Sequence, residues 1–261
     1  MTLDIYQVDA FTSRTFSGNP AAIVPLENWL DDSMLQSIAA ENNLSETAYF
    51  IKNINTYSIR WFTPIQEVDL CGHATLASAH IIFEYLDPSA QEVSFHSKRG
   101  LLKVVRSIEG YVMDFPADHY QKISDPDDNI ASSLNSKIKD CYKGTDDYMV
   151  VLENEQAVRK LQPDFKQLSS TVARGVIATS TGEQVDFVSR AFFPRFGIDE
   201  DPVTGSAHTL LTPYWAEKLG KTKLTALQVS NRLGELTCEL SGNRVLMTGK
   251  AVTYLKGSIF I

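Results

Sequence analysis

The stretch "DLCGHATLASAH", from Asp69 to His80, decides the fold. A cysteine, a glycine and a histidine stand before a run of small residues that is apolar on nearly all sides. A helix of that composition is buried in a core, and we expect it over 72–86. A second stretch, "DPVTGSAHTLL", begins at Asp201 and places another small-residue helix near Gly205. Their similarity indicates an internal repeat.

Four blocks of the first half recur in the same order in the second half, at offsets of 130 to 134 residues. The matched residues are Arg60 and Arg190, Gly72 and Gly205, Gly100 and Gly234, and Met113 and Met247. Alternating apolar and β-branched residues predict short strands on both sides of each central helix. The sequence therefore predicts an α+β fold of two pseudo-symmetric halves, each a curved mixed sheet around one central helix.

The halves are expected over 1–118 and 126–250, joined by a polar segment at 118–129, and a last strand over 251–261 is expected to return to the first half. A further helix is predicted over 33–42, with Asp32 as its N-cap. Pro213 lies inside the second central helix and is expected to kink or split it.

Composition and charge narrow the classes of function. The chain has 261 residues, of which 43% are hydrophobic, and a net charge of −8. That charge disfavours nucleic acid and anionic membranes as partners. No apolar run is long enough for a transmembrane helix. The N-terminus lacks a basic segment, and three widely spaced cysteines are typical of a reduced, cytoplasmic protein. Their spacing fits no zinc pattern, so we expect no metal.

Each central helix begins at a glycine turn. A helix N-terminus presents unpaired N–H groups and a partial positive charge, which suit an anion. If the two halves bring these turns together, they form a cleft for a small carboxylated substrate. No G-x-G-x-x-G or P-loop motif is present, which disfavours a nucleotide-binding enzyme.

Four segments resemble one family: "DAFTSRTFSGNPAAIV", "NLSETAYF", "IRWFTPIQEVDLCGHAT" and "GIDEDPVTGSAH". They are similar to the PhzF-like (phenazine biosynthesis-like) family of the diaminopimelate epimerase fold superfamily. The resemblance covers the whole chain. It implies two halves with the active site between them, a homodimer, and an isomerase that uses no cofactor and no metal.

The resemblance also implies roles for individual residues. In the family, the glutamate of the motif seen here as "LSET" shuttles a proton on a dihydro-hydroxyanthranilate. The implied catalytic residues are Glu46, His73 and Asp201. The implied substrate-binding residues are Gly72, Gly205, Ser206, Asn19 and Cys71. We expect the apolar neighbours of Glu46 to raise its pKa and so let it hold a proton at neutral pH.

Structural roles compete with each of these assignments. Glu46 could make a surface ion pair, His73 could bond a backbone carbonyl, and Asp201 could act as a turn or cap residue. Ser206 could serve only the helix start. Cys71 could take part in chemistry or could simply pack at the helix start.

Cys71 bears on the type of reaction. Diaminopimelate epimerase uses two cysteines, one before the glycine of each half, as base and acid. Here the first position is Cys71 and the second is Thr204, whose hydroxyl is not a base near neutral pH. A one-base isomerisation by Glu46 is therefore the leading hypothesis. The alternatives are an epimerase or racemase that uses Cys71 and Glu46, and a non-catalytic binding protein that retains the fold.

Overall fold

The structure, a computed structural model, describes residues 1–124, 128–171 and 173–261. They form two compact units. The first unit comprises Met1–Asp114 together with Thr248–Ile261, and the second comprises Phe115–Met247. The expected start of the second half, residue 126, lies outside the described residues, as does part of the polar segment 118–129.

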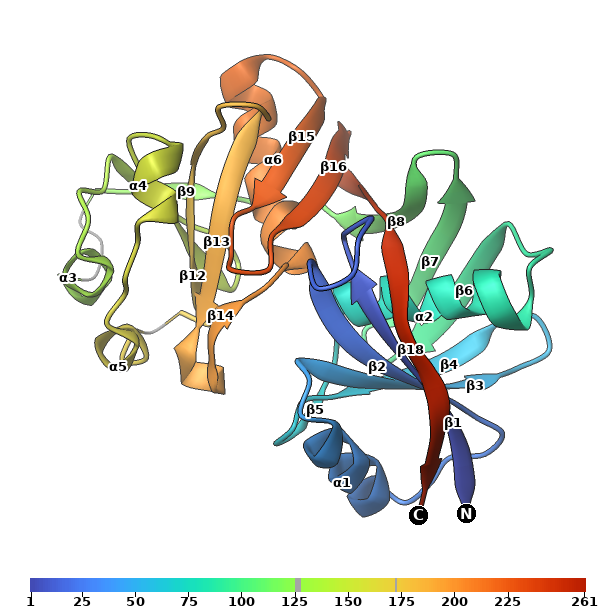
Figure 1. Cartoon of the computed structure of the whole chain (residues 1–261). Coiled ribbons are helices and arrows are strands. Elements are labelled where there is room, and N and C mark those ends of the chain that lie inside the picture. The colour runs from blue at the N-terminus through green and yellow to red at the C-terminus, as the bar shows by residue number, and fades with distance from the viewer. Residues whose placement is uncertain (125–127, 172) are drawn as a thin grey trace. The chain divides into compact units, whose positions relative to one another are not determined.

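The elements of the first unit follow the order expected from the sequence (Figure 1). They are β1 (Thr2–Ala10), β2 (Asn19–Leu26), α1 (Asp32–Asn42), β3 (Glu46–Lys52), β4 (Tyr57–Phe62), β5 (Glu67–Val68), α2 (Gly72–Ile81), the π-helical turn η1 (Ile82–Leu86), β6 (Glu92–Ser97), β7 (Gly100–Ser107), β8 (Gly110–Pro116, which runs past the boundary) and β18 (Ala251–Phe260).

The second unit contains a similar series with extra short helices. Its elements are β9 (Gln121–Ile123), α3 (Asp128–Leu134), β10 (Asp140–Lys143), β11 (Asp147–Val151), α4 (Glu155–Arg159), α5 (Phe165–Leu168), β12 (Gly175–Thr181), β13 (Phe187–Phe193), the 3-10 turn η2 (Pro194–Phe196), β14 (Ile198–Asp201), α6 (Gly205–Leu219), β15 (Lys223–Gln228), β16 (Gly234–Ser241) and β17 (Arg244–Gly249, which also crosses the boundary).

Both units repeat one order of strand pairing. In the first unit, β1 and β2 are antiparallel, β2 and β3 parallel, β3 and β4 antiparallel, β4 and β6 parallel, and β6 and β7 antiparallel. The same alternation runs in the second unit through β10, β11, β12, β13, β15 and β16. The predicted α+β fold with an internal repeat is confirmed.

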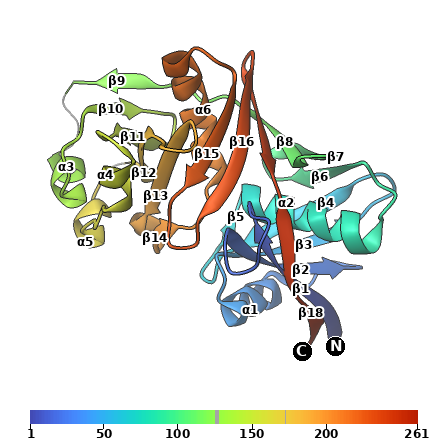
Figure 2. The same cartoon turned by 45° about the horizontal axis from the view of Figure 1, so that its top comes forward.

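One further strand extends each sheet at its first strand. β18 is antiparallel to β1, and β9 is antiparallel to β10. Because β18 ends where β1 begins, the two chain termini lie side by side (Figure 2). The segment 118–129, expected as a linker, thus contains a strand of the second sheet. Its four aspartates and its proline made the segment look like a linker.

An ion pair marks the repeat at the level of side chains. In β4, Arg60 donates from Nε and Nη2 to the two carboxylate oxygens of Glu67 at 2.8 and 2.9 Å. In β13, Arg190 makes the same two-pronged contact with Glu200 at 2.6 and 2.8 Å. Each guanidinium lies 5.1 Å from the ring centre of the phenylalanine two residues further along. The two hairpins that precede the central helices are therefore built alike.

The central helices α2 and α6 lie in the cores of their units. Every residue of α2 after Gly72 is buried, as its apolar composition predicts. The α-helix ends at Ile81, and the remainder of the expected helix 72–86 is a π-helical turn. That wider turn is held by the Asp87 N–H, which donates to the Ile82 carbonyl at 2.7 Å, and by Arg106, which donates to the Phe83 carbonyl at 2.6 Å.

Pro213 does not split α6, which runs unbroken from Gly205 to Leu219. A proline has no N–H, so the carbonyl four residues earlier loses its helical partner. Here that carbonyl belongs to Thr209, and it accepts a hydrogen bond from the Asp118 N–H at 3.0 Å. A bond from outside the helix therefore replaces the missing one, and the expectation of a split helix was wrong.

The start of α1 also differs from the expectation. Asp31, not Asp32, is its N-cap, and Asp32 is the first helical residue. The Asp32 carboxylate instead accepts a hydrogen bond from Arg60 at 2.9 Å. The tandem aspartates gave two equivalent choices, and the distant arginine distinguishes them.

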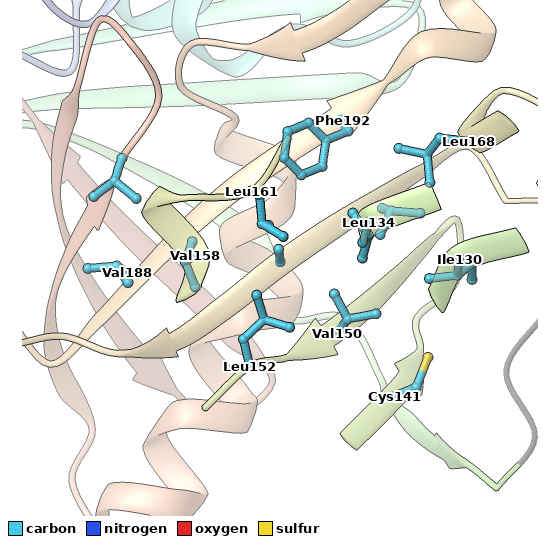
Figure 3. Packing of buried hydrophobic residues seen from close by; sticks show 13 residues of the cluster. Ile130, Leu134, Cys141, Val150, Leu152, Val158, Leu161, Leu168, Val188 and Phe192 are labelled. Carbon is cyan, nitrogen blue, oxygen red and sulfur yellow. The ribbon is translucent and has the colours of Figure 1, made fainter. Parts of the chain in front are cut away.

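Apolar side chains fill both units. In the second unit, residues from α3, α4, α5 and the strands β10 to β13 converge on one cluster, in which Leu134, Val150 and Phe192 are fully buried (Figure 3). In the first unit, Leu35 and Ile38 of α1 belong to one buried cluster with the strand residue Tyr49, so α1 packs on the sheet. Within the described residues, no helix combines the length and the apolar character that crossing a membrane requires.

Candidate functional site

Glu46 and His73 form the centre of the site in the first unit. Glu46 opens β3 and His73 is the second residue of α2. His73 Nε2 lies 3.2 Å from Glu46 Oε2, and the two residues are only 4% and 9% exposed. The competing view of Glu46 as a surface ion-pair residue therefore fails, because its partner is a buried imidazole.

Asn19 determines which nitrogen of His73 carries the proton. The Asn19 side-chain amide lies 3.1 Å from His73 Nδ1, with its NH₂ group towards the ring. Nδ1 thus accepts, so that the ring hydrogen is on Nε2, the nitrogen that lies 3.2 Å from Glu46. Burial lowers the pKa of His73 to about 3, which keeps the imidazole neutral. The contact between His73 and Glu46 therefore joins a neutral ring to a carboxyl group and is not an ion pair.

The sheet brings these residues together. β2 and β3 are parallel neighbours, and Ala21 stands opposite Glu46 in their register. Asn19 and Glu46 therefore emerge at the same edge, where both strands begin. α2 begins beside them, with Cys71 as its N-cap in an extended conformation. The sequence alone could name these residues but could not show that they are neighbours.

Cys71 is part of the same group. Its Sγ lies 3.5 Å from His73 Nδ1, and the residue is 6% exposed. It makes no side-chain cap bond to α2, while its carbonyl accepts a hydrogen bond from the Thr75 hydroxyl at 2.6 Å. The N–H groups at the start of this helix, including that of Gly72, are thus not capped by the cysteine and are suited to an anion.

The second unit holds Asp201 at the start of α6. Asp201 Oδ2 accepts a hydrogen bond from the Thr204 hydroxyl at 2.5 Å. Gln228 joins both residues, because its amide donates to the Asp201 carbonyl at 2.8 Å and its oxygen accepts from the Thr204 N–H at 2.8 Å. Sequence reasoning missed Gln228, which lies at the end of a strand without any motif.

Ser206 also has a charged neighbour that the sequence did not reveal. Arg174 Nη2 lies 3.1 Å from the Ser206 hydroxyl, and Arg174 Nε donates to Asp147 at 2.9 Å. Gly205, the first residue of α6, is buried and lies between Thr204 and Ser206 in the chain. Asp201, Gly205 and Ser206 belong to the second unit, and their joint action with Glu46 and His73 stays a prediction.

The position in the second unit that is equivalent to Glu46 carries no carboxylate. Glu46 stands opposite Ala21 across two parallel strands, and the equivalent pair in the second unit is Gly175 opposite Asp147. A Cβ atom at Gly175 would lie 2.2 Å from Cδ1 of Phe193. No side chain, and hence no carboxylate, fits at the position that corresponds to Glu46.

The residues Glu46, Cys71 and His73 could hold a metal ion. One ligand atom from each residue lies within 4.8 Å of the other two. Among the described residues, this is the group of three potential metal ligands that lie close together. Linear spacing had argued against any such set. That argument was incomplete, because the fold joins a ligand from β3 to two from the start of α2. The absence of a metal from the enzyme's chemistry stays a prediction.

Comparisons with known proteins agree with this arrangement. Residues 8–257 match the family described as phenazine biosynthesis-like protein, PhzC-PhzF. An uncharacterized isomerase of Pseudomonas aeruginosa is 48% identical over 261 residues, which is 100% of both chains. The crystal structure of a PhzF-family phenazine biosynthesis protein from Enterococcus faecalis has a TM-score of 0.96 and 46% identity, with 100% of both chains covered.

A more distant structure shares the fold alone. A hydroxyproline epimerase from Agrobacterium vitis has a TM-score of 0.63 at 11% identity, and covers 99% of this chain and 92% of its own. This protein therefore shares its fold with an epimerase, but it shares substantial sequence identity over its full length with the two proteins of the preceding paragraph. This chain belongs to the phenazine biosynthesis-like (PhzC-PhzF) family.

Proposed function

We propose that the protein is a cofactor-independent isomerase that moves a proton, and with it a double bond, on a small carboxylated substrate. Glu46 is the single acid–base group. The observation that carries the proposal is the buried Glu46 carboxyl group 3.2 Å from the neutral imidazole of His73, at a position where the other repeat has only Gly175. The isomerase name of the relative in Pseudomonas aeruginosa supports the reaction class.

In the proposed mechanism, Glu46 removes a proton from one carbon of the substrate and returns it to another. The electron pair left by the first transfer becomes the relocated double bond. His73 Nε2 lies beside Oε2, so that Oε1 is the oxygen that carries the transferred proton. A neutral imidazole adds no positive charge that would favour the ionised carboxylate, so Glu46 can take up the substrate proton and hold it until it is returned.

The start of α2 supplies the binding site for the substrate carboxylate in this proposal. Uncapped N–H groups and the helix dipole attract a negative charge there. Asp201 and Ser206, at the start of the second helix, are proposed to bind polar groups of the same substrate. A dihydro-hydroxyanthranilate, the substrate that the family resemblance suggests, carries both a carboxylate and an amine.

The test begins with a thermal-shift screen of cyclic and amino-acid carboxylates, because a ligand that binds the folded state raises its melting temperature. Compounds that bind are then incubated with the enzyme in deuterated water and analysed by mass spectrometry and NMR. The proposal expects a product whose double bond has moved and which carries deuterium from solvent at the new position if the proton on Glu46 exchanges. A binder returned with deuterium at one carbon and an unmoved double bond would contradict it.

One specific observation favours a second candidate, an epimerase or racemase. Cys71 Sγ lies 3.5 Å from Nδ1 of His73, and Glu46 Oε2 lies 3.2 Å from Nε2 of the same ring. Two acid–base groups linked through one imidazole could act on opposite faces of a carbon atom. The deuterium experiment separates the candidates, because an epimerase exchanges a proton at one stereocentre without changing the position of unsaturation.

A further inference from the structure

Glu46, Cys71 and His73 supply a thiol, an imidazole and a carboxyl group at one point. These are the three ligand types that Zn²⁺ prefers in proteins, and three protein ligands with an open fourth position are typical of reactive zinc sites. We propose that this triad binds a thiophilic divalent cation, with Zn²⁺ as the prototype, and that the bound ion blocks the site. The ion is an inhibitor, not a cofactor.

The distances are close to those of a coordination shell. Bonds of about 2.0–2.3 Å around a tetrahedral ion place neighbouring ligand atoms roughly 3.3–3.6 Å apart. His73 Nε2 and Glu46 Oε2 are already 3.2 Å apart, and one ligand atom from each of the three residues lies within 4.8 Å of the others. The Cys71 Sγ lies 3.5 Å from Nδ1, so the thiol has to turn towards Nε2 to complete the shell.

Asn19 can support the metal-bound form of His73. A metal ion at Nε2 requires the ring hydrogen to be on Nδ1, where it needs an acceptor. The Asn19 amide lies 3.1 Å from Nδ1 and presents its nitrogen there in the metal-free protein. A half-turn of the amide presents its oxygen instead, which makes Asn19 a matched partner for both tautomers.

The same atoms serve the proposed reaction and the ion, so they exclude one another. An ion between Nε2 and Oε2 displaces the hydrogen on Nε2, and it occupies the carboxylate that would receive the substrate proton. Inhibition therefore rests on the proposed function, whereas the binding of the ion does not.

The ligand set also predicts which ions bind. Ca²⁺ and Mg²⁺ need several oxygen ligands, and the triad offers one carboxylate. The other two thiols provide an internal control. Burial raises the pKa of Cys141 to about 11 and that of Cys238 to about 12, which makes both poor sources of the thiolate that a metal needs.

The experiment uses the full chain, stripped with a chelator and then titrated with Zn²⁺ by calorimetry, and with Co²⁺ as a spectroscopic probe. We expect one Zn²⁺ per chain and a thiolate-to-Co²⁺ charge-transfer band in the near ultraviolet. Cys71→Ser should lower the affinity by about tenfold or more and abolish the band, as the loss of a ligand requires. Cys238→Ser should change neither, and Mg²⁺ should not compete.

Two results would overturn the proposal: no stoichiometric Zn²⁺ binding by the parent protein, or binding that survives both Cys71→Ser and Glu46→Gln. Circular dichroism of each variant confirms that it is folded before titration. The outcome is separate from that of the isomerase proposal, because an enzyme that turns over its substrate yet ignores Zn²⁺ would contradict only the metal site. If the parent protein binds Zn²⁺ but the Glu46→Gln variant keeps its turnover, only the mechanism would be contradicted.

Discussion

His73 Nε2 lies 3.2 Å from the buried carboxylate oxygen Oε2 of Glu46. The ring is neutral, because burial lowers its pKa to about 3, and its other nitrogen accepts a hydrogen bond from Asn19. The carboxyl group of Glu46 thus has beside it an imidazole that carries no permanent positive charge. The chemistry proposed for this protein depends on that relationship.

The tautomer of His73 gives the first prediction. Nitrogen-15 NMR of the parent protein should show a neutral His73 with its hydrogen on Nε2 between pH 5 and 8. Asn19→Asp leaves only acceptor oxygens at Nδ1, so Nδ1 should then carry a hydrogen. A parent protein with a doubly protonated His73 at pH 7 would contradict this account of the site.

Gly175 gives a prediction about the asymmetry of the repeat. Gly175→Ala places a methyl group 2.2 Å from a ring carbon of Phe193 and 2.8 Å from the backbone oxygen of Phe192. We expect it to lower the free energy of unfolding by about 1–3 kcal/mol, the usual cost of overpacking. The control is Gly257→Ala in β18, where the nearest atom is 3.9 Å away and chemical denaturation should show no loss.

Three buried histidines predict how stability depends on pH. Burial lowers the pKa of His73 to about 3, and of His80 and His208 to about 4. In the unfolded chain each takes up a proton near pH 6.5. The stability that comes from their neutral forms is thus fully present above pH 6.5 and is lost as the pH falls towards 4, by up to about 1.4 kcal/mol per pH unit for each proton.

Thermal unfolding measured from pH 7.5 to pH 4.5 tests this dependence. His208→Gln should reduce the slope of stability against pH by about one proton, while His119→Gln, at an exposed position, should leave it unchanged. An equal slope in the parent and in His208→Gln would show that this histidine is not kept neutral by folding.

Arg174 and Asp147 give a prediction about the second unit. Asp147 is buried, and Arg174 bonds both its carboxylate and the hydroxyl of Ser206. Arg174→Gln leaves the carboxylate without its opposing charge and should cost about 1–3 kcal/mol. Adding Asp147→Asn should recover part of that loss. Additive effects of the two changes in urea denaturation would mean that the pair is not coupled.

Much of this arrangement follows from the sequence, for identifiable reasons. The small-residue helices after Gly72 and Gly205 are apolar all round, so their burial could be predicted from composition alone. Glu46 and His73 were identified through short motifs. The sequence could not show that the two side chains lie side by side, because that depends on the parallel register of β2 and β3, which joins residues far apart in the chain.

Other features had no local signal. Gln228 and Arg174 occur in no motif, and only the folded chain shows that they hold the start of α6. The strand β9 lies in a polar segment that reads as a linker, and it forms because β10 offers it an edge. The continuity of α6 through Pro213 depends on one outside hydrogen bond, from Asp118 to Thr209, which local propensity cannot anticipate.

The most direct test of the central claim is the turnover of two variants in deuterated water, with a substrate identified by the binding screen. Glu46→Gln keeps the shape of the site but cannot accept a proton. We predict that it binds the carboxylate nearly as well as the parent and loses turnover by a factor of roughly 10² to 10⁴, whereas Cys71→Ala loses far less and the control Glu84→Gln loses none. An active Glu46→Gln beside an inactive Cys71→Ala would contradict the account and identify the thiol as the base.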